Sequence, residues 1–216
     1  MKTASAIALG LTVALSATAC GSTPMQNPVA RTHVDVKDNQ PPRPAIQRNP
    51  HPTAYQVTLA IKDAPGPFEV VKAAMQYEVL DPKCRPDLGG MSGTRAELLE
   101  WVPVELRKQA DGTYQGTIYD GLLKDEDYYG LGVCHWSLVT VQFKLKARDN
   151  ESDTEFSYHL WHQDLTADGT KHAYFPRRAY PSTSIAGMTY PGEENIERYK
   201  PEVRDKLFTL NLSIKE

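Results

Sequence analysis

The chain has 216 residues, of which 40% are apolar, with 11 tyrosines and 3 tryptophans. This composition is typical of a globular protein and excludes a chain that is disordered throughout. The formal net charge of −3 is unevenly spread: residues 21–52 carry four Lys or Arg against two Asp, a net +2. Subtracting this and Lys2 leaves −6 for residues 53–216. An acidic domain behind a slightly basic segment argues against nucleic acid as a ligand.

The first residues have the layout of an export signal. Lys2 precedes a short apolar run over residues 4–15, which is too short for a membrane-spanning helix. The stretch Ala-Thr-Ala-Cys-Gly around Cys20 resembles the bacterial lipobox, which implies removal of residues 1–19 and a lipid on Cys20. By the same resemblance, Gly21 implies sorting to the outer membrane. The alternative is an ordinary secretory signal with an incidental cysteine.

Residues 20–52 are predicted to form a tether between the lipid and a folded domain. The segment after Cys20 contains seven prolines and no sustained apolar periodicity. We therefore expect a largely disordered chain with extended, polyproline-like stretches. A short edge strand over residues 33–36 is an alternative for one part of it. The folded domain is expected over residues 53–216.

This domain is predicted to consist of β-strands. Apolar and polar residues alternate over 55–61, which is the period of a half-buried strand. Val70-Val71 interrupts the alternation of the next strand and predicts a bulge. Residues 97–100 could equally form a helical turn, with Thr94 at the spacing of a capping box. The further strands are expected at 68–79, 102–106, 114–118, 137–147, 156–160 and 208–214.

The turns between these strands support the same fold class. Asp111-Gly112 is a hairpin signal, and a charged turn is expected at residues 149–153. The expected helix content is one short helix near residues 193–199. About seven strands with so little helix predict an all-β, two-sheet sandwich of immunoglobulin-like or fibronectin-like character.

The three cysteines are an odd number, which usually leaves one thiol unpaired. Assigning Cys20 to lipid leaves Cys84 and Cys134 as a pair in an oxidising periplasm, where disulfides persist. We predict a disulfide between them, closing a loop of about 50 residues and contributing on the order of 4 kcal/mol in the chain-entropy model. Two separate buried thiols are the alternative. A redox role lacks support because the chain has no Cys-x-x-Cys spacing.

The densest motif is Asp-Glu-Asp-Tyr-Tyr-Gly-Leu-Gly-Val-Cys-His-Trp, residues 125–136. An acidic turn, a tyrosine and then a cysteine resemble the F strand of immunoglobulin domains, although the spacing is wrong for a tyrosine corner. We interpret the motif as a rigid turn that enters a disulfide-pinned strand, with Trp136 packed nearby. A catalytic use of the carboxylates is the alternative. The predicted acidic binding patch consists of Asp125, Glu126, Asp127, Tyr128 and Tyr129.

Common catalytic and metal-binding patterns are missing from the sequence. His159 and His162 are three residues apart in a predicted strand, so their side chains should point to opposite faces, and no metal site is predicted. The sequence has no Gly-x-Ser-x-Gly nucleophile elbow, phosphate-binding loop or dinucleotide fingerprint. We therefore expect no cofactor and no enzymatic activity.

Residues 171–200 combine aromatic residues, prolines and arginines in a stretch expected to lack regular structure. Long loops of this kind are often functional, and Tyr and Arg are enriched at protein-binding hot spots. Prolines would reduce the conformational entropy lost on binding. The alternative is a crossover between sheets whose aromatic residues cover the core. The predicted protein-binding residues are Tyr174, Phe175, Arg177, Arg178, Tyr180 and Tyr190.

The lipobox, the Pro-rich tether, the β-domain and the motif at 125–136 together resemble small proteobacterial envelope lipoproteins. Some of these act as immunity proteins to secreted antibacterial effectors. The resemblance implies a protein on the periplasmic face of the outer membrane, held by lipid alone, that binds and neutralises a toxin. It transfers no functional residue. A structural or assembly lipoprotein of an envelope or secretion machine is the main alternative, and a cell-wall or lipid hydrolase is a third.

Overall fold

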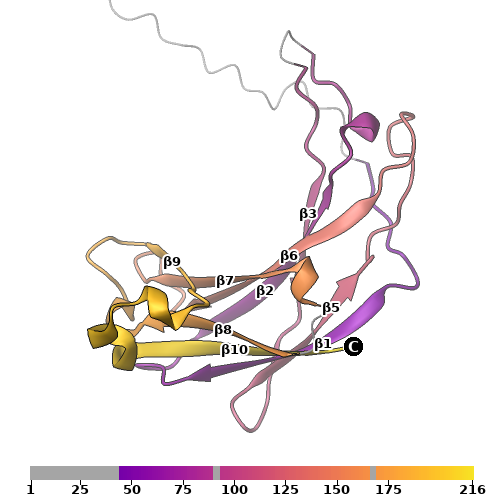
Figure 1. Ribbon diagram of the computed structural model, residues 1–216. Helices are drawn as coiled ribbons and strands as arrows, with labels where there is room; N and C mark the ends of the chain where they lie inside the picture. The colour runs from indigo at the N-terminus through magenta and orange to yellow at the C-terminus, as the bar shows by residue number, and fades with distance from the viewer. Residues whose placement is uncertain (1–43, 90–92, 166–168) are drawn as a thin grey trace, which may run out of the picture. The chain divides into compact units, whose positions relative to one another are not determined.

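The computed structural model describes residues 44–89, 93–165 and 169–216. The export signal, Cys20, the alternative strand at 33–36 and most of the tether lie outside the described residues. The strands are β1 Thr53–Lys62, β2 Val70–Val79, β3 Leu99–Val104, β4 Arg107–Lys108, β5 Tyr114–Asp120, β6 Trp136–Lys146, β7 Glu155–Trp161, β8 Gly169–Pro176, β9 Thr189–Pro191 and β10 Leu207–Lys215 (Figure 1). The 3₁₀ helices are η2 Pro82–Cys84, η3 His162–Asp164, η4 Arg177–Ala179, η5 Ile196–Arg198 and η6 Pro201–Lys206.

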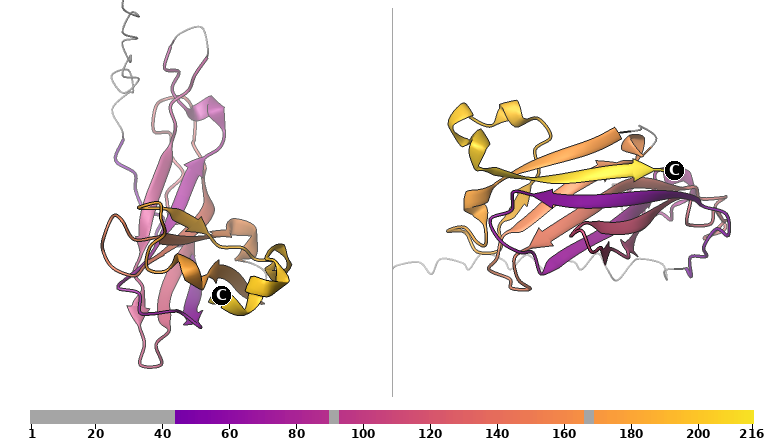
Figure 2. Two further views of the ribbon diagram at one scale, coloured as in Figure 1. Left: turned by 90° about the vertical axis from the view of Figure 1, so that its left-hand side faces the viewer. Right: turned by 90° about the horizontal axis from the view of Figure 1, so that it is seen from below.

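The strands form two sheets of five, so the fold is the predicted all-β, two-sheet sandwich. One sheet has the order β4-β5-β1-β10-β8, and the other has the order β3-β2-β6-β7-β9. Neighbouring strands are antiparallel, except that β9 runs parallel to β7. The view from below in Figure 2 shows β1 and β10 of the first sheet in front of the second sheet.

Alternation along each strand decides which face it buries, because successive side chains point to opposite sides of a sheet. Val57 and Leu59 of β1 lie opposite Ile214 and Leu212 of β10, and all four are buried. In the second sheet, β2, β6 and β7 bury their own alternating residues against them. Those residues are Ala73, Met75, Tyr77, Val79, Leu138, Val141, Phe143, Leu145, Phe156, Tyr158 and Leu160.

Aromatic rings join the two sheets at one end of the sandwich. Phe156 of β7 lies 5.0 Å from Phe208 and 5.6 Å from Phe175, between ring centroids, and both contacts are edge-on. Phe68, just before β2, packs against Phe156 at 5.9 Å. Pairs with this geometry contribute about 0.5–1.5 kcal/mol beyond their buried area. Residues far apart in the sequence are therefore held together here.

The bulge lies in β6, and the prediction of a bulge at Val70-Val71 is wrong. Val139 has no partner in β2, whereas the residues on either side of it pair with consecutive residues of that strand. As a result, Leu138 before the bulge and Val141 after it both face the core. An extra residue in one strand of a pair has this effect, since it resets the alternation.

Residues 171–200 are more regular than predicted, and the expectation of a structureless loop is wrong. β8 is an edge strand of the first sheet and β9 an edge strand of the second, so the segment crosses between the sheets. Tyr174 N–H donates to the Glu193 carbonyl oxygen at 2.9 Å, which pins the crossover against β8. The short helix expected near 193–199 is the 3₁₀ helix η5. The alternative helical turn at 97–100 is also wrong, because β3 begins at Leu99.

The folded domain begins before the predicted boundary at Thr53. Asn49 N–H donates to the Leu122 carbonyl oxygen at 2.8 Å, and Lys124 N–H donates to the Gln47 carbonyl oxygen at 2.9 Å. Ile46 packs against the core. The end of the expected tether is therefore part of the sandwich, because a short ladder ties it to the segment after β5.

Candidate functional site

The aromatic residues predicted to contact a partner mainly support the fold. Phe175 is fully buried in the aromatic core, so its predicted role as a contact residue is wrong. Tyr180 is half-buried against Phe68, with ring centroids 5.4 Å apart, and Tyr190 packs against Phe156 at 6.5 Å. Burial also raises the pKa of Tyr180. The alternative reading, in which these rings cover the core, describes the structure better.

The remaining residues of that predicted set lie on the edge of the first sheet. Tyr174 is half-buried in β8, and its carbonyl oxygen accepts a hydrogen bond from Tyr199 Oη at 3.0 Å. Burial raises the pKa of Tyr199 to about 12, so this hydroxyl remains a donor. Arg177 and Arg178 are exposed in η4. Of the six residues predicted in this segment, only the two arginines are therefore exposed.

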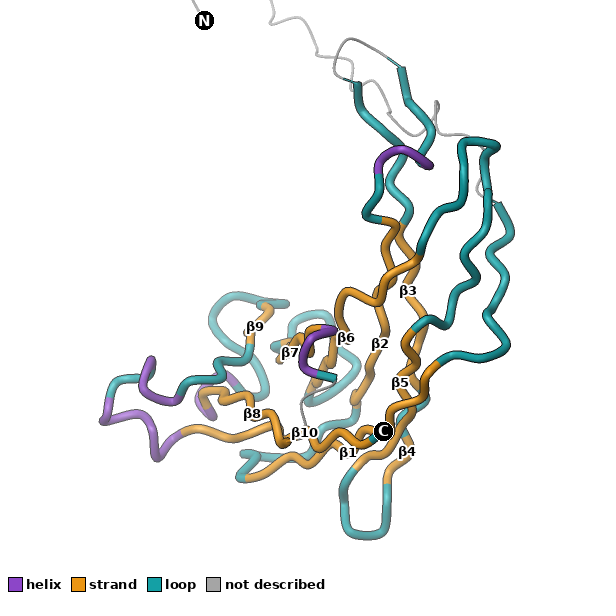
Figure 3. The backbone as a smooth tube through the Cα atoms, turned by 45° about the vertical axis from the view of Figure 1, so that its right-hand side comes forward, coloured by secondary structure: helices purple, strands orange, loops and turns teal. Residues whose placement is uncertain are grey.

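A second candidate surface is the loop of residues 124–136, called here the Cys134 loop. It leads into β6 and, together with residues 80–89 and 93–98, extends beyond the strand ends (Figure 3). The predicted Cys84–Cys134 disulfide joins these two segments, with the Cα atoms 5.4 Å apart. Both cysteines are buried. Cys134 Sγ also lies 3.2 Å from the Cys84 carbonyl oxygen. This is a contact and not a hydrogen bond, because a disulfide sulfur has no hydrogen to donate.

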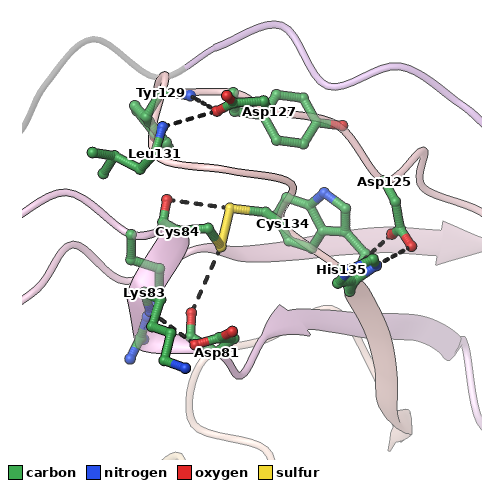
Figure 4. Close-up of a disulfide and its surroundings, with 12 residues drawn as sticks. Asp81, Lys83, Cys84, Asp125, Asp127, Tyr129, Leu131, Cys134 and His135 are labelled. Carbon is green, nitrogen blue, oxygen red and sulfur yellow. Dashed lines mark hydrogen bonds and ion pairs between the residues drawn. A yellow bond between two sulfur atoms is a disulfide. The ribbon is translucent and has the colours of Figure 1, made fainter.

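The carboxylates of the acidic patch hold the Cys134 loop in shape (Figure 4). Asp127 Oδ1 accepts hydrogen bonds from the Leu131 N–H at 3.0 Å and from the Tyr129 N–H at 3.4 Å. Asp125 Oδ2 lies 2.7 Å from His135 Nδ1 at the other end of the loop. Figure 4 shows that Asp125 and Asp127 serve different parts of the loop. The acidic turn is thus fixed from within.

Further contacts make the base of the loop rigid. The Cys134 N–H donates to the Glu126 carbonyl oxygen at 3.0 Å, and Lys124 Nζ pairs with Glu126 Oε1 at 3.1 Å. Tyr128 packs edge-on against Trp136 and donates its hydroxyl to the Lys124 carbonyl oxygen. Burial raises the pKa of Tyr128. A tyrosine that bonds to backbone just upstream is a tyrosine-corner feature, although the spacing to the cysteine differs.

Apolar side chains project from this fixed loop. Leu131 is 49% exposed and Val133 is 52% exposed. Gly130 and Gly132, on either side of Leu131, have φ angles of 71° and 106°, which side-chain-bearing residues rarely adopt. Sequence reasoning missed Leu131 and Val133 as candidates. The available signal was a pair of apolar residues between glycines in a segment too short to be a strand.

A cavity of about 870 Å³ opens between the sheets beside β3 and β5. Met75 and Val102 line it from one sheet, Tyr119 lines it from the other, and Arg48 also lines it. The backbone N–H and carbonyl oxygen of Tyr119 both have hydrogen-bonding partners beside this cavity. Tyr77 Oη donates to its carbonyl oxygen, and Met75 Sδ lies 3.2 Å from its N–H. The edge of β5 is therefore closed to an added strand at this residue.

No protein-family model, no curated protein and no solved structure matches this chain. Across residues 44–89, 93–165 and 169–216, no group of three or more His, Cys, Asp or Glu is placed to hold a metal ion. None of the helices in the described part of the chain has the length and apolar character needed to cross a bilayer. The Cys134 loop is therefore a candidate binding site on the basis of its geometry alone.

Proposed function

We propose that this chain is a lipid-anchored periplasmic protein that binds another protein through the Cys134 loop. In the specific form of the proposal, it is an immunity protein that neutralises a secreted antibacterial effector. The observation that carries the proposal is the exposure of Leu131 and Val133 on a loop fixed by a disulfide and by Asp127. Cys20, lipidated, would keep the domain where such an effector arrives.

The energetics favour a protein partner for these side chains. Burying a fully exposed Leu or Val side chain contributes about 1.5–3 kcal/mol. Leu131 and Val133 are about half exposed, so a partner that covers them gains roughly half of this from each. A loop already fixed in one conformation loses little entropy when it binds. Exposed aliphatic side chains on a rigid loop are otherwise unfavourable in water, and contiguous exposed apolar surface marks interaction sites.

Charge narrows the chemistry of the partner. Residues 124–136 contain three carboxylates and one lysine, a formal charge of −2 with His135 neutral. The partner should therefore present an apolar pocket with basic residues at its rim. Such a rim would mainly speed association, while the pocket would set the rate of dissociation. Arg177 and Arg178 stay a separate, untested prediction of contact residues.

The experiment compares Leu131→Asp and Val133→Asp with the wild-type chain and with Ile185→Asp. Ile185 is a matched control because it is also an exposed aliphatic residue, 62% exposed, but lies outside the Cys134 loop. Each variant complements a deletion strain that is challenged with effector-secreting sibling cells, and tagged protein is used to recover the effector. Loss of a hot-spot residue, about 2 kcal/mol, should weaken binding about thirtyfold. Equal thermal midpoints would show that the variants fold.

The expected result is that Ile185→Asp protects the cells and the two loop variants do not. Unchanged survival of the deletion strain, with no effector recovered, would disprove the immunity function. If deletion instead abolished secretion and the protein co-purified with secretion components, the assembly function would replace it. Turnover of wall or lipid that is lost on replacing an acidic or His residue would point to a hydrolase.

A further inference from the structure

Two of the three tryptophans in the chain are exposed on the outer face of the second sheet. Trp101 of β3 is 42% exposed and Trp161 of β7 is 49% exposed, while Trp136 is buried. Tryptophan is highly buried on average in folded proteins. Two exposed indoles on one sheet face therefore call for an explanation, and the Cys134 loop does not involve them.

Strand register places both indoles on one row across the sheet. Trp101 pairs with Gln76 of β2, Gln76 pairs with Thr140 of β6, and Thr140 pairs with Trp161. Directly paired residues lie on the same face of a sheet. Three strand spacings of about 4.8 Å put the two Cα atoms roughly 14 Å apart. The row thus has one flat aromatic side chain at each end. Between them lie Gln76, whose amide donates to Glu78, and Thr140, which is buried.

The next row supplies fixed hydrogen-bonding groups. Gln142 Nε2 lies 3.1 Å from His159 Nε2, and the His159 ring stacks beside Trp161 with centroids 6.1 Å apart. Burial, with a smaller effect of Lys144, lowers the pKa of His159, so the ring is neutral near pH 7. An amide nitrogen can only donate, so His159 Nε2 accepts and its Nδ1 carries the proton.

A shallow cavity of about 380 Å³ lies beside Trp101 on this face. Ala74 and Pro103 are small lining residues, and Lys72 and Lys144 bring two positive charges. No acidic residue is among the described residues that line the cavity. Lys144 Nζ pairs with Glu155 at 3.1 Å, outside the lining, whereas Lys72 is exposed. Because Glu155 balances Lys144, Lys72 supplies the positive charge that would attract an anion to this end of the row.

We propose that the outer face of β3, β2, β6 and β7 binds an acidic polysaccharide, with pyranose rings stacked on Trp101 and Trp161 and carboxylates near Lys72. A pyranose ring has an apolar face of C–H groups that packs against an indole, and hydroxyl groups at its rim that hydrogen-bond to side chains such as Gln142 and His159. The strip offers both kinds of contact, because the indoles lie at its two ends and Gln142 and His159 lie in the neighbouring row.

A protein partner fits this face less well. Protein hot spots cluster near the centre of an interface in well-packed, desolvated pockets. Trp101 and Trp161 instead lie at opposite ends of a row, three strand spacings apart. An elongated ligand of alternating apolar and polar character uses such a row fully. This site is independent of the Cys134 loop, so either proposal can fail alone.

The test uses the mature full-length chain in detergent, with calorimetry and tryptophan fluorescence as readouts. The probes are oligogalacturonate, which is acidic, murein glycan strands, which carry carboxylates from muramic acid, and neutral chito-oligosaccharide. Trp101→Ala and Trp161→Ala should each weaken binding of the acidic probes about tenfold, the size of one aromatic stacking contact. Lys72→Gln should weaken binding of the acidic probes and leave the neutral one unchanged. Ile185→Ala and Lys62→Gln are the controls.

Each outcome decides the proposal. Binding of oligogalacturonate but not of murein strands would assign the site to an acidic exopolysaccharide, and the reverse would assign it to the cell wall. Absence of binding to every probe would overturn the proposal, as would undiminished binding by a Trp101→Ala/Trp161→Ala double variant. Loss of effector capture in that double variant, with saccharide binding intact, would show instead that the face is a protein interface.

Discussion

Asp153 is an acidic residue whose side chain is only 1% exposed, and a single arginine neutralises it. Arg148 donates from Nε to Asp153 Oδ2 at 2.9 Å and from Nη2 to Oδ1 at 2.8 Å, a bidentate pair. These hydrogen bonds hold the pKa of Asp153 below its ordinary value, despite the opposing effect of burial. A depressed pKa stabilises the folded state above the unfolded value, near pH 4, and the stabilisation is lost as pH falls through the folded pKa.

We therefore predict that Asp153→Asn lowers the thermal midpoint at pH 7, where the wild-type carboxylate is ionised. The difference between the two proteins should shrink as pH falls below about 4, because the wild-type carboxyl is then protonated as well. The measurement is thermal unfolding followed by circular dichroism from pH 3 to pH 8. Asp149→Asn, at an exposed residue of the same turn, is the control. A difference that stays constant across this range would contradict the explanation.

At the scale of elements, the disulfide joins the Cys134 loop covalently to the segment after β2. It joins residues 50 positions apart, so the chain-entropy model gives about 4 kcal/mol of stabilisation. We predict that the Cys84→Ser/Cys134→Ser double variant loses an unfolding free energy of this size. The measurement is denaturant unfolding with a linear extrapolation to water.

The same variant also tests whether the loop works as a fixed element. Without the disulfide, the loop should sample more conformations and bind the proposed partner more weakly, even at temperatures where the sandwich is folded. The wild-type chain under reducing conditions serves as a second comparison and should behave like the double variant. Full partner binding by a folded double variant would show that the covalent link is unnecessary for recognition.

Strands were predictable from the sequence where a whole alternating run faces the core, as in β1 and β10. β8 was missed because its core-facing residues are only Ala173 and Phe175, too few to establish a period before Pro176 ends the strand. The bulge was misplaced for a related reason. The alternation of apolar and polar residues is interrupted in both β2 and β6. Only the pairing between the two strands shows which of them carries the extra residue.

At the scale of the whole molecule, the surfaces were much less predictable than the core. The sequence indicated that Cys84 pairs with Cys134, but it could not show that Leu131 is exposed, because exposure depends on what other segments cover. The row from Trp101 to Trp161 was unpredictable for the same reason, because it depends on how distant segments come together. It exists only after three strand pairings are fixed, and its ends are 60 positions apart in the sequence. A local sequence pattern does not specify the registers of three successive strand pairings.

The docking of residues 44–52 is also a property of the whole molecule, since it joins the end of the expected tether to the segment after β5. Asn49 alone contributes two hydrogen bonds, from its N–H to the Leu122 carbonyl oxygen and from Nδ2 to the Gly121 carbonyl oxygen, both 2.8 Å. Leu122 and Leu123 are buried in this arrangement. The segment therefore covers apolar surface of the sandwich as well as backbone.

We predict that a chain beginning at Thr53 is less stable than one beginning at Pro44 by about 3 kcal/mol. The two hydrogen bonds of Asn49 and the one to the Gln47 carbonyl oxygen are lost at about 1 kcal/mol each. The contact between Ile46 and the core is lost too, so this value is a lower limit. Denaturant unfolding of the two chains measures the difference, and a chain beginning at Cys20 is the reference. Equal stability of all three chains would place the domain boundary at Thr53 after all, with residues 44–52 resting on the sandwich without stabilising it.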